Sequence, residues 1–120
     1  MSEQEAIIIE PHSRILLAVL QAARMDEEAA RAIQARVLDA ADQSPDRPVL
    51  LDMSKVEFMP SLSLGVLVAL LRKFKQEGRR FILAGLKPQV RETLTICRLI
   101  KVFEIYDTVD DALLKINNLN

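Results

Sequence analysis

The sequence predicts a single α/β domain built on a mixed, mostly parallel sheet. Short apolar runs alternate with longer segments in which apolar residues recur at helical spacing, a pattern typical of strands joined by helical crossovers. The chain has 120 residues, which is enough for one domain with a hydrophobic core and too few for two. Because no repeat, low-complexity tract or linker interrupts the sequence, we expect one domain over residues 1–120.

The first elements expected are a hairpin and a helix. Residues 6–20 contain two apolar runs split by the polar stretch 11–14, which favours two antiparallel strands. From Asp26 the apolar residues recur at helical spacing. Asp26 is a suitable N-cap, and Glu27 and Glu28 suit the positive end of the helix dipole.

Three strand and helix pairs follow. A helix over roughly residues 62–77 is expected to end at Gly78, the next to begin at Pro88, and the last to be capped by Asp107 or Thr108. This gives the order β-β-α-β-α-β-α-β-α, with about four helices, right-handed crossovers and an antiparallel hairpin at the N-terminus. The buried strands that precede these helices are predicted at 49–53, 81–85 and 102–106.

Composition argues against several classes of function. The net charge of −1 provides no field that attracts nucleic acid or anionic membrane. The start of the chain lacks the features of a secretion signal, and no apolar run is long enough for stable membrane insertion. The basic segment 72–80 is expected to be solvated rather than to bind nucleic acid. We therefore expect a cytoplasmic protein.

Catalytic and metal-binding side chains are scarce. The chain has one histidine, His12, and one cysteine, Cys97, so a soft-metal site or catalysis by these residue types is not expected. No glycine-rich phosphate loop follows a strand, and no base lies near a nucleophile. The sequence predicts a protein without cofactor or metal that is not an enzyme.

The segment 52-DMSKVEFMPSLSLGVLVALLRKFK-75 places serines at the mouth of an apolar helix. A hydroxyl on Ser61 would be well placed to carry a phosphate, because unpaired backbone N–H groups and the helix dipole favour negative charge there. The alternative is that Ser61 only caps the helix, a contribution of about 1 kcal/mol. Ser63 is expected about one turn into the helix, on its surface.

This pattern resembles the STAS domain family, in particular the single-domain bacterial anti-sigma factor antagonists. The resemblance covers roughly the whole chain, and most of its weight falls on the central segment. The segments that carry it are 20-LQAARMDEEAARAIQARV-37, 50-LLDMSKVEFMPSLSLGVLVAL-70 and 78-GRRFILAGLKPQVRETLTICRLIKVFEIYDTVDDAL-113.

The resemblance implies a non-enzymatic regulator that binds a protein partner. In the family, that partner is a serine kinase that is itself an anti-sigma factor; it binds the unphosphorylated domain and phosphorylates a serine. By position, the phosphoacceptor falls on Ser61, and Asp26 and Asp52 fall on two acidic positions near it. The residues expected to contact the partner are Asp26, Asp52, Met59, Pro60, Leu62 and Ser63.

Within the central segment, three residues differ from the family motif. Pro60 stands at the motif aspartate, Leu62 at a small residue and Ser63 at a glycine. These differences favour a second reading, a scaffold subunit that binds partners without phosphorylation. A third reading is an accessory module of a lipid or solute transport system, which exposed side chains at Leu62 and Leu64 would fit. The oligomeric state stays open.

Overall fold

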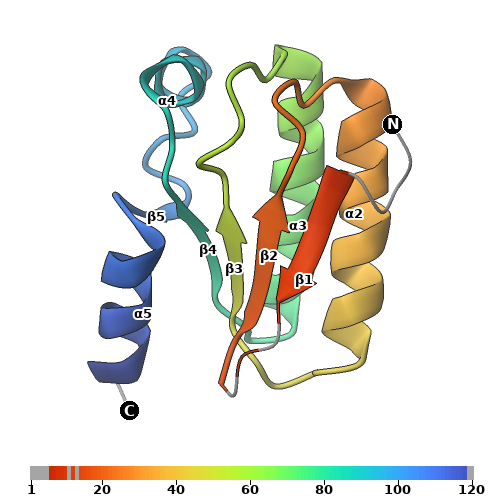
Figure 1. Ribbon diagram of the computed structural model, residues 1–120, viewed down its shortest axis with the longest axis vertical. Helices are drawn as coiled ribbons and strands as arrows, with labels where there is room; N and C mark the ends of the chain where they lie inside the picture. Colours follow the sequence, from red (N-terminus) through yellow and green to blue (C-terminus); the bar gives the residue numbers. More distant parts are fainter. Residues whose placement is uncertain (1–5, 11, 13, 119–120) are drawn as a thin grey trace.

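A five-stranded mixed sheet forms the centre of the protein (Figure 1). The computed structural model describes residues 6–10, 12 and 14–118. The strands lie side by side in chain order, and only β1 runs antiparallel to its neighbour. Their bounds are β1 (Ile7–Glu10), β2 (Leu16–Leu20), β3 (Val49–Asp52), β4 (Phe81–Ala84) and β5 (Glu104–Tyr106).

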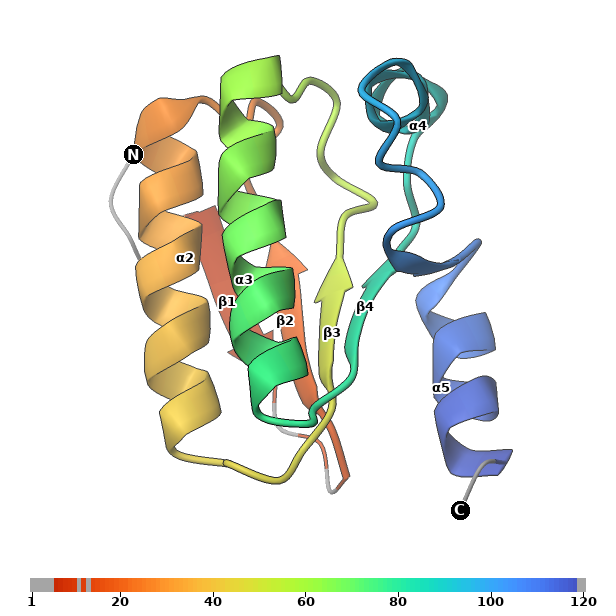
Figure 2. The same cartoon turned by 180° about the vertical axis from the view of Figure 1, so that it is seen from behind.

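The helices cover the two faces of the sheet unequally. Helices α2 (Glu27–Asp42) and α3 (Leu64–Gln76) pack side by side on one face, as Figure 2 shows. On the other face, α5 (Val109–Asn118) lies against β4 and β5. Helix α4 (Pro88–Ile96) lies at the end of the molecule where α2 and α3 begin (Figure 2).

Alternation of side chains along the strands divides the core between the two faces. In β3, Val49 and Leu51 belong to the cluster under α2 and α3, whereas Leu50 belongs to the cluster under α5. All three are completely buried, as expected for a central strand between parallel neighbours. Each such side chain contributes about 1.5–3 kcal/mol through removal from water.

The predicted order of elements is confirmed, including the N-terminal hairpin, in which Ile7 pairs with Leu20. The final helix is capped by Thr108, whose hydroxyl oxygen accepts the N–H of Asp111 at 3.0 Å. The start of the central helix differs from the expectation. Residues Ser61–Ser63 form a 3₁₀ turn, and the α-helix begins at Leu64.

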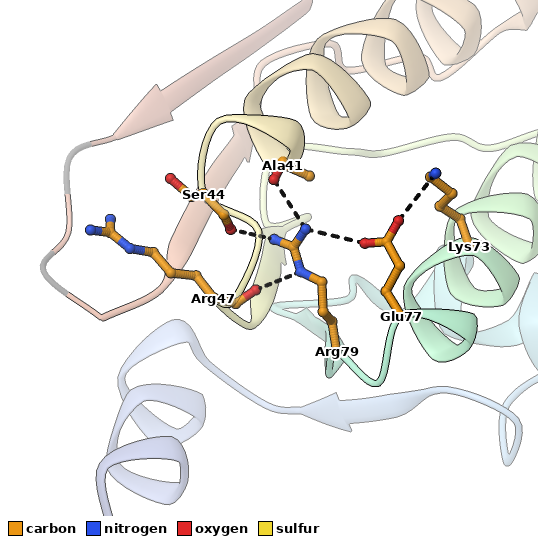
Figure 3. Close-up of polar contacts among 6 residues, drawn as sticks. All are labelled: Ala41, Ser44, Arg47, Lys73, Glu77 and Arg79. Carbon is orange, nitrogen blue, oxygen red and sulfur yellow. Dashed lines mark hydrogen bonds and ion pairs between the residues drawn. The ribbon is translucent and has the colours of Figure 1, made fainter.

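One arginine of the basic segment is buried, which corrects the expectation that the whole segment is solvated. Arg79 is 8% exposed, and its guanidinium donates to the carbonyl oxygens of Ala41, Ser44 and Arg47 at 2.9–3.0 Å (Figure 3). Glu77 lies 3.4 Å from the same group. These bonds join the end of α2 and the following loop to the end of α3.

Candidate partner-binding site

Two loops at the carboxyl ends of β2 and β3 are tied together by backbone hydrogen bonds. The N–H of Met25 donates to the carbonyl of Phe58 at 2.8 Å, and the N–H groups of Glu57 and Phe58 donate to the carbonyl of Ala23 at 2.7 and 3.1 Å. Met25 and Val56 are completely buried below them. This pairing fixes the path of the chain into the turn at Pro60.

The turn at the start of α3 presents two side chains to solvent. Pro60 is extended, with φ −62° and ψ 152°, and ends the loop. Ser61 is exposed, and the Leu62 side chain is 74% exposed. The N-cap residue is Pro60 for the 3₁₀ turn and Ser63 for α3, and neither makes a side-chain capping bond. Because Ser61 occupies neither N-cap position, the reading of Ser61 as a helix cap is wrong.

A second apolar side chain is exposed in the adjoining loop. Phe58 is 43% exposed, and the guanidinium of Arg24 lies 4.5 Å from the centre of its ring. This cation–π contact holds the ring at the surface. The sequence analysis did not select Phe58. It lies two residues after the buried Val56, which is the spacing of side chains on one face of a strand. We call Phe58, Ser61 and Leu62 the apolar lip.

Two of the residues expected to contact a partner are buried. Met59 and Ser63 are each 2% exposed. Met59 belongs to the core cluster under α2 and α3, and Ser63 lies below the surface where a helix-surface position was expected. A 3₁₀ helix has three residues per turn, and in this one Ser63 points inward while Ser61 and Leu62 point outward.

The two acidic residues lie in different surroundings. Asp26 is exposed and caps α2, where its carboxylate accepts the N–H of Ala29 at 2.9 Å. Asp52 accepts the N–H of Ser54 at 3.0 Å and lines a hollow with Gly85 and Asp110. The residues that line this hollow include neither Asp26 nor any residue of the apolar lip. The structure therefore does not bring both carboxylates into one pocket with Ser61.

A pocket of about 280 Å³ separates the first turns of α2 and α3. Its rim carries an ion pair in which the Arg31 guanidinium lies 2.8 Å from the Glu27 carboxylate. The lining residues are Glu27, Ala30, Arg31 and Gln34 from α2, and Leu62, Ser63, Gly65 and Val66 from the start of α3.

Neither a metal-binding group of side chains nor a membrane-spanning helix is found among residues 6–10, 12 and 14–118. In these ranges no three His, Cys, Asp or Glu side chains are grouped so as to hold a metal ion. None of the helices described has the length and apolar character needed to cross a bilayer. The features that stand out are the apolar lip and the pocket beside it.

The fold and this site agree with a known family. The STAS domain family model matches residues 6–112, and the chain belongs to that family. The anti-sigma F factor antagonist of Paenibacillus polymyxa is 24% identical over 102 residues, which cover 85% of this chain and 87% of that relative. A Thermotoga neapolitana protein named by homology as an anti-sigma factor antagonist is 38% identical over 65 residues. That match spans 54% of this chain and 58% of the relative's length.

Solved structures show the same fold. An anti-sigma factor antagonist from Mycobacterium paratuberculosis superposes with a TM-score of 0.80 at 27% identity, over 92% of each chain. SpoIIAA in its unphosphorylated form superposes with a TM-score of 0.78 at 21% identity, over 94% of this chain and 97% of that one.

Proposed function

We propose that this protein is an anti-sigma factor antagonist that binds a serine kinase of the anti-sigma type through the apolar lip. The observation that supports this most directly is the exposure of Ser61 and Leu62 at the start of α3. The Leu62 side chain, at 74% exposure, has no packing role in this fold that would explain an apolar residue there. Large apolar side chains exposed together on one surface are typical of a protein contact.

Phosphorylation of Ser61 by that kinase would act as the switch. The first turns of the 3₁₀ segment and of α3 contain no acidic residue, so the positive end of the helix dipole is not already neutralised by a carboxylate. A phosphate on Ser61 would add nearly two negative charges at the lip without entering the core. Among structural relatives, SpoIIAA has been solved in a phosphorylated form.

The experiment that tests this proposal is an intact-mass measurement. The purified chain is incubated with a serine kinase of the anti-sigma type from the same genome and with ATP. We expect a mass gain of one phosphate in the parent and none in Ser61→Ala. The matched control is Ser54→Ala, because Ser54 is also exposed on a loop but lies away from the lip and should leave the gain unchanged.

A scaffold that binds its partner without phosphorylation is the second candidate. Pro60, with its fixed φ of −62°, stiffens the segment that a kinase must draw into its active site. The exposed Leu62 suits a permanent apolar contact. If the kinase binds the parent but the mass does not change, the scaffold function replaces the switch.

A further inference from the structure

We infer that the side of the protein formed by the α4–β5 loop and α5 binds a second copy of the chain. A two-fold axis would relate the two copies, so that a basic apolar surface on each meets an acidic apolar surface on the other. The inference goes beyond the proposed function, because neither the apolar lip nor phosphorylation takes part in it. It is carried by two exposed apolar surfaces of opposite charge on one side of the sheet.

The first surface lies on the loop between α4 and β5. We call it the basic patch, and its members are Ile96, Arg98, Lys101 and Val102. Ile96 is 73% exposed and Val102 is 53% exposed. Arg98 and Lys101 are also exposed, and no ion pair in the described part of the chain includes either of them. Because residues 93–103 contain no acidic residue, the patch carries two uncompensated positive charges beside its apolar side chains.

The backbone at Arg98 has a conformation that an arginine adopts only with strain. The N–H of Arg98 donates to the carbonyl of Thr95 at 3.0 Å, and the N–H of Leu99 donates to the carbonyl of Leu94 at 2.8 Å. This is a helix C-terminal cap in which glycine usually takes the position of Arg98. Its φ of 61° is the only positive φ outside glycine among the described residues. A strained residue that the cap does not require indicates a role for its side chain.

The second surface lies on the solvent side of α5. We call it the acidic face, and its members are Asp110, Asp111 and Leu114. Leu114 is 62% exposed and belongs to neither core cluster of the described residues. The two aspartates precede it by four and three residues, so both lie beside it on the helix. Residues 107–115 contain three aspartates and one lysine, which leaves this surface negatively charged.

The two surfaces lie on the same side of the molecule. Strand β5 is an edge strand that pairs only with β4. The loop that carries the basic patch leads into β5, α5 follows it, and both views place them beyond this edge of the sheet (Figures 1 and 2). A two-fold rotation about an axis on this side brings each basic patch opposite the acidic face of the other copy. Each contact is then made twice, with charges that match and apolar side chains that leave water.

A second copy fits these charges better than an anionic membrane does. Two exposed cations are fewer than the roughly four to eight that are typical of anionic-lipid binding. The acidic face on the same side would also be repelled by a negatively charged bilayer. A second copy of the chain supplies carboxylates for the basic patch and cations for the acidic face at the same time.

The first test is sedimentation equilibrium of the purified chain alone. We expect a monomer–dimer equilibrium with a Kd on the order of 100 µM, in the range of weak contacts. The patch variant, Arg98→Glu with Lys101→Glu, should weaken dimerisation about tenfold or more. Its control is Arg72→Glu with Lys75→Glu, which makes the same change in net charge at exposed positions of α3 and should leave the Kd unchanged. A parent that stays monomeric at about 1 mM, or equal weakening in both variants, would overturn the inference.

A mixture of charge-reversed chains shows whether the partner is a second copy. The face variant, Asp110→Lys with Asp111→Lys, should be monomeric by itself, as the patch variant is. Mixed in equal amounts, the two variants should form heterodimers with about the Kd of the parent, because every contact again joins opposite charges. Heterodimers no tighter than the homodimers of each variant would contradict the inference. Because the aspartates also favour the start of α5, Leu114→Lys tests the same face with that turn intact, and we expect dimerisation about tenfold weaker.

Arg98→Gly separates binding from folding. At a concentration where the chain is monomeric, its unfolding midpoint should equal or exceed that of the parent, because glycine takes a φ of 61° without strain. Its dimerisation should be about three- to tenfold weaker. A lower midpoint would show that Arg98 serves the fold, and would contradict the inference. Binding of the parent to vesicles of equal parts phosphatidylcholine and phosphatidylserine, lost in the patch variant, would assign the patch to a membrane and exclude the second copy.

Discussion

At the scale of single residues, the start of α3 shows how neighbours in sequence take opposite environments. Ser61 and Leu62 are exposed, whereas Ser63 is 2% exposed. The proposed function assigns phosphorylation to Ser61 and partner contact to Leu62, whereas Ser63 is withdrawn from the surface. Their different exposure follows from the 3₁₀ turn that carries them.

A second residue with unusual surroundings is Tyr106, on the edge strand β5. Its hydroxyl donates to the Glu104 carboxylate at 2.9 Å. Burial is the main cause that raises its pKa above the ordinary 10.0, and the hydrogen bond to Glu104 adds to it. Arg80, which pairs with the same carboxylate, acts in the opposite direction on this pKa.

This arrangement predicts how stability varies at alkaline pH. Because the pKa of Tyr106 is raised in the folded state, its contribution is complete below pH 10.0 and is lost as the pH rises through the folded pKa. The chain has one tyrosine and no tryptophan, so tyrosinate absorbance reports Tyr106 alone. We expect a midpoint above 10.0 in the native protein, and a smaller rise in Glu104→Gln. A native midpoint at or below that of the unfolded chain would contradict this assignment.

At the scale of elements, Arg79 joins α2 to α3 through backbone carbonyl groups. We predict that Arg79→Met lowers the free energy of unfolding by roughly 3 kcal/mol, because one buried and two partly buried carbonyl groups lose a charged donor. Urea unfolding measures the change. Arg80→Met is the matched control: the Arg80 side chain is 32% exposed and has one carboxylate partner, so its loss should be about 1 kcal/mol or less. Equal losses in the two variants would contradict a special role for Arg79.

The elements themselves were predictable where local chemistry is strong. Asp26 at the start of α2 and Pro88 at the start of α4 are signals that act within one turn of chain. The burial of Arg79 was not predictable, because its acceptors are more than 30 residues away in sequence. The inward direction of Ser63 depends on a 3₁₀ turn that the apolar pattern does not distinguish from an α-helix.

At the scale of the whole molecule, the parallel sheet places the candidate site. Strands β2, β3 and β4 all end at the edge where α2 and α3 begin (Figure 2), so loops far apart in sequence meet there. The alternation of side chains also explains why Asp52 does not share the pocket. Leu50 faces α5, and Asp52, two residues further, lies on the same side. Family resemblance could align these acidic residues but could not show which face each one occupies.

The most direct test of the central claim is the affinity of the protein for a purified serine kinase of the anti-sigma type, measured by calorimetry for the parent and for Leu62→Lys. The Leu62 side chain is 74% exposed, so the unfolding midpoint should hardly change, while a lysine in the apolar contact should weaken binding about tenfold or more. Leu114→Lys is the control, because Leu114 is 62% exposed on α5, on the opposite face of the sheet. Loss of affinity in Leu62→Lys alone is the predicted result; unchanged affinity in that variant would contradict a docking surface at the apolar lip.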